Sequence, residues 1–223
     1  MEYSVVIDAG HGGADNGAIY KGRKEKDDNL RLALEVGNIL SQNGVDVTYT
    51  RVDDTYDTPF EKATMGNNSG ADLFLSIHRN SGPDPNTSKG VETLVFDNSG
   101  IKSVIANNIN SNLSKMGYVN RGTTERPNLV VLKRTKMPAV LVEAGFINND
   151  EDNKLFDDNF EETAQAIATG ILDTLKETNM SAMENAKSKE IYRVQVGAFE
   201  NLENAVLMEQ RLRKQGYNTF IVG

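Results

Sequence analysis

Residues 5–13 read VVIDAGHGG, an apolar run that leads directly into a histidine flanked by glycines. The β-branched residues at its start predict a buried strand. Gly10, Gly12 and Gly13 reach backbone conformations that other residues avoid, so the chain is free to turn sharply after that strand. The chain has only two histidines, and His11 lies in this turn. We infer that the loop positions the His11 side chain.

Short apolar runs recur along the chain and alternate with helical patterns. The runs are too continuous for a sheet with one face in water, which indicates a sheet covered on both sides. Strands that alternate with helices predict an α/β domain whose twisted sheet is mostly parallel and flanked by helices. The predicted strands are residues 3–7, 45–50, 73–77, 91–96, 129–132 and 139–142.

Apolar residues recur at helical spacing between the strands. They share one face in residues 30–40 and again in residues 160–175, so each segment predicts an amphipathic helix. Thr58, Pro59 and Glu61 mark the start of another helix. They supply a capping residue, a proline at the first helical position and the acid of a capping box.

The composition narrows the chemistry that the chain can carry. Its 223 residues are 38% hydrophobic and 25% charged, as in soluble proteins, and we expect no membrane insertion because no apolar run is long enough to span a bilayer. Without cysteine, any metal must be bound by imidazole, carboxylate or water. The net charge of -8 argues against a nucleic-acid partner. The first residues lack the features of a signal peptide, so we expect synthesis in the cytoplasm without Sec export.

The pattern changes after residue 176. Residues 177–190 have no apolar face worth burying and predict a linker. Residues 191–223 predict a small βαβ unit, with strands at 191–196 and 219–222 and a helix at 201–215 whose inward residues are Leu202, Ala205, Met208 and Leu212. A unit of this size rarely supports a core alone, so we expect a homodimer through residues 191–223. The predicted parts are thus 1–176, 177–190 and 191–223.

Two further polar residues end apolar strands, as His11 does. His78 follows residues 73–77 and Glu143 follows residues 139–142. Taken singly, His11 fits a turn residue, His78 a core histidine, and Glu143 a cap or an arginine partner. Together they favour a metal site, because the carboxyl ends of parallel strands line the ligand crevice and burying these groups without a partner costs free energy.

A catalytic zinc ion needs a third protein ligand besides two imidazoles. Glu25 lies between the first strand and the first helix, in the segment GRKEKDDNL, so its loop starts from the same edge of the sheet as His11. Mixed charge runs of this kind are usually solvated. Spacing alone does not choose between Glu25 and Asp27.

Four motifs, in order, are similar to those of one enzyme family: IDAGHGGADNGA, EKDDNL, LFLSIHRN and MPAVLVEAGFINNDEDN. Over about residues 5–175 the chain resembles zinc-dependent N-acetylmuramoyl-L-alanine amidases of the Amidase_3 type. The resemblance implies one zinc ion per catalytic domain with His11, Glu25 and His78 as ligands, and Glu143 as the catalytic acid. Relatives usually carry a small or neutral residue where Arg79 stands. We expect Arg79 and Asn80 to contact substrate.

The end of the chain also resembles a known domain. YRVQVGAF at residues 192–199, with the helix after it and Gly216-Tyr217, is similar to one repeat of a SPOR domain, which ordinarily has two. An arbitrary amphipathic βαβ fragment is the alternative. Residues 189–223 carry five basic and four acidic side chains, so charge attraction to an anionic wall explains binding poorly. Recognition of glycan lacking stem peptides, which the resemblance implies, fits better.

The resemblance to these two families implies an enzyme that lyses bacterial cell walls. It would hydrolyse the amide between N-acetylmuramic acid and L-alanine of peptidoglycan, acting on the wall after release from the cell. The alternatives are a zinc peptidase that cuts within the stem peptide and a non-catalytic glycan-binding protein. A phage endolysin and an autolysin of mother-cell lysis both fit the sequence.

Overall fold

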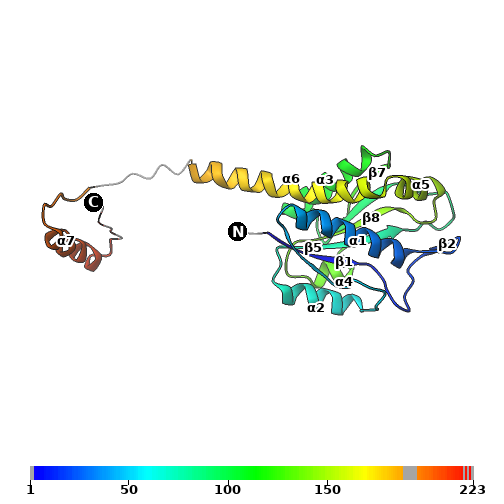
Figure 1. Cartoon of the computed structure of the whole chain (residues 1–223), viewed down its shortest axis with the longest axis horizontal. Coiled ribbons are helices and arrows are strands. Elements are labelled where there is room, and N and C mark those ends of the chain that lie inside the picture. The colour runs from blue at the N-terminus through cyan, green and yellow to red at the C-terminus, as the bar shows by residue number, and fades with distance from the viewer. Residues whose placement is uncertain (1–2, 188–194, 218, 220, 222–223) are drawn as a thin grey trace. The chain divides into compact units, whose positions relative to one another are not determined.

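The computed structural model of the chain describes residues 3–187, 195–217, 219 and 221 (Figure 1). It divides into two compact units, Met1–Met180 and Ser181–Gly223, which are described separately. Among the described residues, no helix combines the length and the apolar character needed to cross a bilayer.

A six-stranded sheet forms the centre of the first unit. Its strands are β1 (Ser4–Ala9), β4 (Asp46–Tyr49), β5 (Leu73–Asn80), β6 (Val91–Val95), β7 (Asn120–Glu125) and β8 (Ala139–Phe146). They lie in the order β4-β1-β5-β8-β6-β7. Neighbouring strands pair in parallel except β6 and β8, which are antiparallel. The mostly parallel sheet confirms the predicted α/β class.

Helices cover both faces of this sheet (Figure 1). One face carries α1 (Glu25–Gln42), α3 (Gly100–Ser114) and α6 (Phe160–Lys187), and the other carries α2 (Pro59–Ser69) and α4 (Val130–Arg134). Val36, Ile109 and Ile167, one from each helix of the first group, are fully buried in one cluster with strand residues. On the second face, Val131 of α4 packs in a cluster with Phe74.

The two clusters separate the residues of β5 by their position along the strand. Leu73, Leu75 and Ile77 lie in the cluster with α1, whereas Phe74 lies in the cluster with α4. Successive side chains of a strand point to opposite faces. Continued to the end of β5, this alternation sends His78 to the face of α2 and α4 and Arg79 to the face of α1.

The predicted helix start at Thr58 is confirmed. The Glu61 backbone nitrogen donates to Thr58 Oγ1 at 3.2 Å, and the Thr58 backbone nitrogen donates to Glu61 Oε2 at 2.8 Å. These reciprocal bonds form a capping box, with Pro59 in the first turn. Local sequence therefore determines where α2 begins.

The prediction of a strand at residues 129–132 is wrong, because these residues lead into α4. Leu129 is the N-cap, and Val131 and Leu132 are buried against the sheet. The periodicity of a short apolar run does not distinguish a strand from a buried helical turn. The sequence analysis also missed β7, whose residues NRGTTE lie at the edge of the sheet and include none that is buried.

The segment predicted as a linker is largely helical. α6 continues to Lys187, so residues 177–187 belong to this helix. The packed part of α6 before residue 176 has already nucleated the helix. Adding further residues to its end therefore costs less free energy than starting a new helix.

The second unit contains α7 (Leu202–Lys214), which confirms the predicted helix. Asn201 caps it by accepting a hydrogen bond from the Glu203 backbone nitrogen at 2.8 Å. Leu202, predicted to face inward, is instead 69% exposed. The predicted strands lie largely outside the described residues, and Gln195, Val196, Thr219 and Ile221 are not in strands.

Candidate metal centre

Three segments that are distant in the sequence bring His11, Glu25 and His78 together. His11 follows β1, Glu25 is the first residue of α1, and His78 lies near the end of β5. His11 Nε2 lies 3.1 Å from Glu25 Oε1, and His78 Nδ1 lies 2.9 Å from the same oxygen. One donor atom from each residue lies within 4.8 Å of the other two. Among the described residues this is the only such group of three or more potential metal ligands.

Glycines make this close approach possible. A Cβ added to Gly10 would lie 2.3 Å from the His78 ring, and one added to Gly17 would lie 2.5 Å from Glu25 Oε2. His11 itself has φ of 61°, a left-handed conformation that costs a residue with a side chain about 1–3 kcal/mol. The packing around the loop must therefore hold His11 in place.

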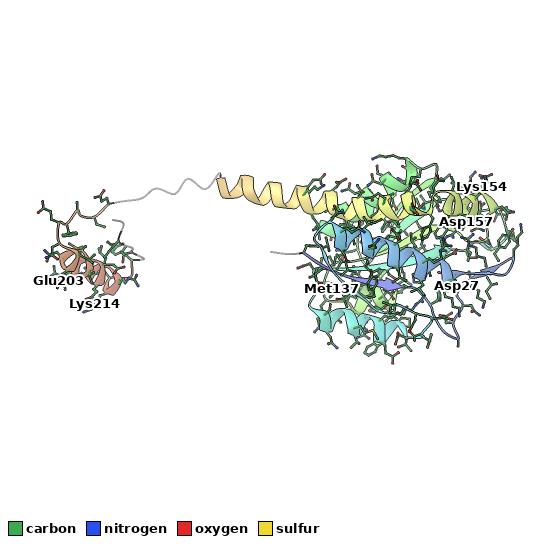
Figure 2. All side chains as sticks on the ribbon, in the orientation of Figure 1. Asp27, Met137, Lys154, Asp157, Glu203 and Lys214 are labelled. Carbon is green, nitrogen blue, oxygen red and sulfur yellow. The ribbon has the colours of Figure 1, made fainter. Side chains whose placement is uncertain are left out.

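The structure shows which of the two acids, Glu25 or Asp27, lies near the histidines; sequence spacing alone did not. Glu25 is buried and faces the two imidazoles, whereas Asp27 is exposed and lies on the outside of the first unit (Figure 2). The two residues are two positions apart on a helix, which turns their side chains about 200° from each other. Only Glu25 is in reach of a shared ion.

Groups behind two of these side chains, His11 and Glu25, hold them in orientation. Asp15 Oδ2 lies 2.8 Å from His11 Nδ1, and the Ala18 backbone nitrogen donates to Glu25 Oε2 at 2.9 Å. A carboxylate on the far nitrogen of a ligating histidine fixes its tautomer and its orientation. The sequence analysis missed Asp15, although an acid four residues after His11 was a usable signal.

The charges of this cluster are strongly coupled. Burial works against the charged forms, but hydrogen bonds from both histidines hold the pKa of Glu25 well below its usual range. Burial likewise opposes the imidazolium, yet hydrogen bonds to Glu25 and Asp15 raise the pKa of His11 to about 9. A buried carboxylate that attracts positive charge from two sides suits a divalent cation. The donor set, two imidazoles and one carboxylate, is one that zinc uses in catalytic sites.

Glu143 lies beside this cluster on the same face of the sheet. It pairs in register with His78 on β5 and with Glu92 on β6. Burial raises the pKa of Glu143 to about 7, and the negative charges of Glu25 and Glu92 add to the effect while His78 opposes it. Its Oε2 atom is screened from solvent and makes no hydrogen bond with any described residue. A carboxyl group with this pKa can take up and release a proton near neutral pH.

Asn80 and Thr124 extend the row of polar residues. Asn80 Nδ2 donates to Glu92 Oε1 at 2.7 Å, and Thr124 Oγ1 donates to Glu92 Oε2 at 3.1 Å. Glu92 therefore has both oxygens occupied, whereas Glu143 has one oxygen without a partner. Sequence reasoning missed Glu92, because a lone acid at the start of a strand carries no signal.

Arg79, which was expected from the sequence to contact substrate, is buried instead. It is only 2% exposed, and its guanidinium donates to Asp28 Oδ2 at 2.6 Å and to Asn153 Oδ1 at 2.8 Å while lying over the Phe156 ring. The predicted strand ended at residue 77, but β5 continues to Asn80. Strand alternation then turns Arg79 into the layer opposite His78.

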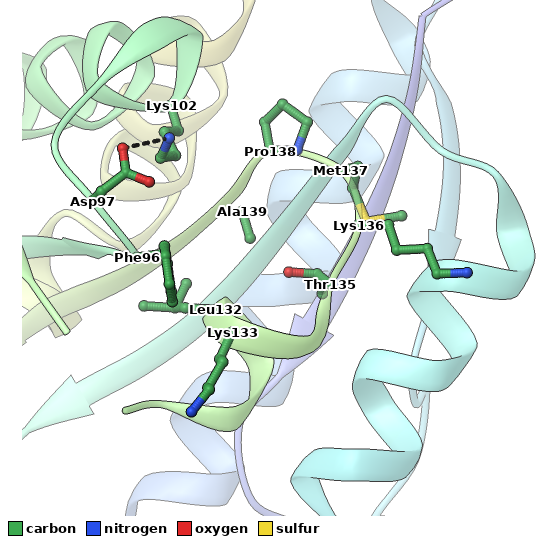
Figure 3. Close-up of a pocket in the computed structure, with 10 residues that line it drawn as sticks. All are labelled: Phe96, Asp97, Lys102, Leu132, Lys133, Thr135, Lys136, Met137, Pro138 and Ala139. Atoms are coloured by element: carbon green, nitrogen blue, oxygen red, sulfur yellow. Dashed lines mark ion pairs between the residues drawn. The ribbon is translucent and has the colours of Figure 1, made fainter. Parts of the chain in front are cut away.

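A hollow of about 330 Å³ lies at the other end of β8 (Figure 3). Its lining includes Phe96, Leu132 and Ala139, and it contains no histidine; its Lys102 is paired with Asp97 at 3.0 Å. Ala139 is the first residue of β8, so the hollow lies at the N-terminal end of this strand, whereas Glu143 lies further along it. The hollow is therefore separate from the candidate centre.

Comparisons with known proteins show which families the chain is similar to. The family described as N-acetylmuramoyl-L-alanine amidase matches residues 5–173, and the SPOR domain matches residues 163–223, starting within α6. A sporulation-specific N-acetylmuramoyl-L-alanine amidase of Bacillus subtilis (strain 168) is 32% identical over 98% of this chain and 84% of its own. An endolysin of Bacillus phage SPP1 is 38% identical over 78% of this chain and 67% of its own. The crystal structure of an N-acetylmuramoyl-L-alanine amidase from Clostridium difficile 630 is 36% identical, with a TM-score of 0.73 over 78% of this chain and 97% of that one.

Proposed function

The chain belongs to the N-acetylmuramoyl-L-alanine amidase family, and from this membership we propose that it uses a zinc ion held by His11, Glu25 and His78. The bond to be hydrolysed joins the lactyl group of N-acetylmuramic acid to L-alanine of the stem peptide. The observation that carries the proposal is the convergence of three ligand atoms within 4.8 Å of one another beside a carboxyl group with a raised pKa.

The bound zinc ion would supply the chemistry of a Lewis acid, which lowers the pKa of a water molecule and polarises the amide carbonyl. The protein's part would be to hold three donor atoms toward that ion. Asp15 Oδ2 accepts a hydrogen bond from His11 Nδ1, which leaves His11 Nε2 to face the centre. The Ala18 backbone nitrogen holds the far oxygen of Glu25. His11 and Glu25 thus each have a hydrogen bond that fixes their orientation before substrate arrives.

We assign the proton transfers to Glu143. Its ionised carboxylate accepts a proton from the attacking water as the oxygen bonds to the carbonyl carbon. It then passes that proton to the nitrogen of L-alanine as the carbon–nitrogen bond breaks, so the products are a free carboxylate on the lactyl group and a free amine on the peptide. The unpartnered Oε2 atom of Glu143 supports this role, because a carboxyl oxygen held by other groups would be less able to exchange a proton.

Asn80 remains a proposed substrate contact. It lies two residues beyond His78 on β5 and is half-buried, with one hydrogen bond to Glu92. We do not propose this role for Arg79, because its guanidinium is buried on the opposite face of the sheet, against α1.

For the rest of the chain, we propose a division into a catalytic domain at 1–176, a connecting segment at 177–190 and a peptidoglycan-binding part at 191–223. The SPOR match supports the binding role, and the helix cap at Asn201 and α7 lie within that part. A homodimer through residues 191–223 remains a prediction. Sedimentation of the full chain at micromolar concentration tests it, and a monomer there would contradict it.

Digestion of purified peptidoglycan with mass analysis of the products tests the proposed reaction. We expect released stem peptides with a free L-alanine amine, loss of activity with a chelator and recovery when zinc is added. New termini inside the stem peptide would support a peptidase instead. Glycan binding without any cleavage would support a non-catalytic protein.

A further inference from the structure

Arg51 is a buried arginine that lies behind the metal cluster and that no motif singled out. It is 4% exposed and follows β4 by two residues. Its guanidinium forms hydrogen bonds with four backbone carbonyls: Nε donates to Ala9 at 3.0 Å, Nη1 to Asp53 at 3.0 Å, and Nη2 to both Gly10 and Lys26 at 2.9 Å. Among the described residues it forms no ion pair within 4.0 Å. Its hydrogen bonds are therefore directed at the backbone.

Two of these carbonyls belong to residues next to the proposed metal ligands. Gly10 immediately precedes His11, and Lys26 immediately follows Glu25. A single nitrogen atom, Nη2 of Arg51, thus joins the two chain segments that carry these proposed ligands. Asn29 also bonds to the Gly10 carbonyl and to Glu25, but both of its contacts are 3.3 Å long. The two hydrogen bonds of Arg51 Nη2 are shorter, at 2.9 Å each.

The loop that carries His11 is packed directly on this guanidinium. A Cβ added to Gly12 would lie 3.1 Å from Arg51 Nε, so the loop and the arginine are in close contact. Lys62 of α2 supports the same loop from a second direction, because its Nζ donates to the carbonyls of Ala9 at 2.6 Å and His11 at 3.2 Å. These bonds hold the backbone of His11 in its left-handed conformation.

We propose that Arg51 is a positioning residue for the metal centre, which sets His11 and Glu25 at the separation that one ion requires. The inference rests on the proposed function. The planar guanidinium is suited to this task, since it presents donors in several fixed directions, whereas a lysine at the same position would keep the charge without the fork. Arg51 touches neither the substrate nor the ion, and acts through the backbone.

The substitution Arg51→Lys keeps the positive charge but removes the planar set of N–H donors, so it tests whether the donors are what matters. Zinc affinity of the full chain is measured by competition with a chromophoric chelator, and thermal unfolding of the metal-free protein is measured in parallel. We expect the dissociation constant for zinc to rise about 10- to 100-fold, the range found when groups behind metal ligands are altered. The midpoint of unfolding of the metal-free protein should change by only a few degrees. Arg31→Lys, on the exposed side of α1, is the matched control and should leave zinc affinity unchanged.

Equal zinc affinity in the wild-type and Arg51→Lys proteins would overturn the inference while leaving the zinc centre intact. Absence of zinc binding in the wild type would instead overturn the proposed function. If Arg51→Lys does not fold, Arg51→Gln is tested in the same way, because an amide keeps two N–H donors. Failure of both variants to fold without metal would show that Arg51 supports the whole fold, and this too would overturn the positioning role.

Discussion

His78 and Glu143 occupy the same rung of the parallel strands β5 and β8, so that a proposed metal ligand and a proposed proton carrier project side by side from one face of the sheet. Adjacent strands lie about 4.8 Å apart, which is close enough for their side chains to act on one substrate. The spacing is set by the backbone hydrogen bonds of the sheet. The register of the sheet therefore determines how close these two side chains lie.

Replacing Glu143 by glutamine tests its assigned role. The amide has the size of the carboxyl group but cannot accept and return a proton, so we expect peptidoglycan hydrolysis to fall about 10²- to 10⁴-fold. The zinc content, measured by atomic absorption, should stay at the wild-type value. Glu151→Gln, an exposed change on a neighbouring segment, serves as the control. Hydrolysis at the wild-type rate in Glu143→Gln would contradict the assignment.

Glu25→Gln and Asp27→Asn form a matched pair for the metal ligand. Each removes one negative charge near the start of α1, but only Glu25 faces the two histidines. We expect Glu25→Gln to lose bound zinc and hydrolysis, and Asp27→Asn to keep both. Zinc should also raise the melting temperature of the wild type, because a ligand that binds only the folded state stabilises it. Equal zinc contents in the two variants would exclude Glu25 as a ligand.

Asp15→Asn tests the support of His11. Loss of the carboxylate removes the acceptor that fixes the ring at its Nδ1 atom, so we expect zinc to bind about 10- to 100-fold more weakly. Zinc competition with a chelator measures this change. Asp46→Asn, an exposed change on β4, is the control. An unchanged dissociation constant in Asp15→Asn would show that His11 is held by the loop alone.

Arg79→Met tests the position of Arg79 in the fold. Breaking a buried ion pair costs about 3–5 kcal/mol, and we expect the lower end, about 3 kcal/mol, because Arg23 still pairs with Asp28 at 2.6 Å. Urea denaturation measures the loss. If Arg79 contacted substrate, the KM for peptidoglycan fragments would rise in the folded variant, and such a rise without a loss of stability would contradict the buried position.

The buried pair of Asp8 and Lys62 predicts how stability depends on pH. Burial works against the ionised Asp8, but Lys62 at 2.9 Å and a hydrogen bond from Ser76 hold its pKa below the usual range. A lowered pKa in the folded state means that Asp8 contributes stability above its unfolded pKa of about 4, and that this contribution is lost as the pH falls below that value. Urea midpoints between pH 7 and pH 3 should therefore fall less in Asp8→Asn than in the wild type. Equal slopes for the two proteins would rule out this linkage.

Much of the fold was accessible from local sequence. The apolar runs at β1, β5 and β8 are buried on both faces, so their composition alone predicted strands, and the capping residues at Thr58 and Glu61 predicted the start of α2. β7 and α4 were not accessible in the same way. An edge strand needs no apolar run, and a four-residue apolar run is compatible with either a strand or a helical turn.

In the candidate site, too, local sequence predicted some features and tertiary contacts decided the others. The sequence by itself determined that a glycine-rich turn carries His11 and that His78 and Glu143 lie next to buried apolar runs, because these features depend on neighbouring residues only; both strands in fact continue beyond these two residues. Tertiary structure decided which acid joins the histidines, which way Arg79 points and that Arg51 lies behind the loop. Each of these depends on contacts between segments far apart in the chain, where strand register and helix rotation determine which side chains meet.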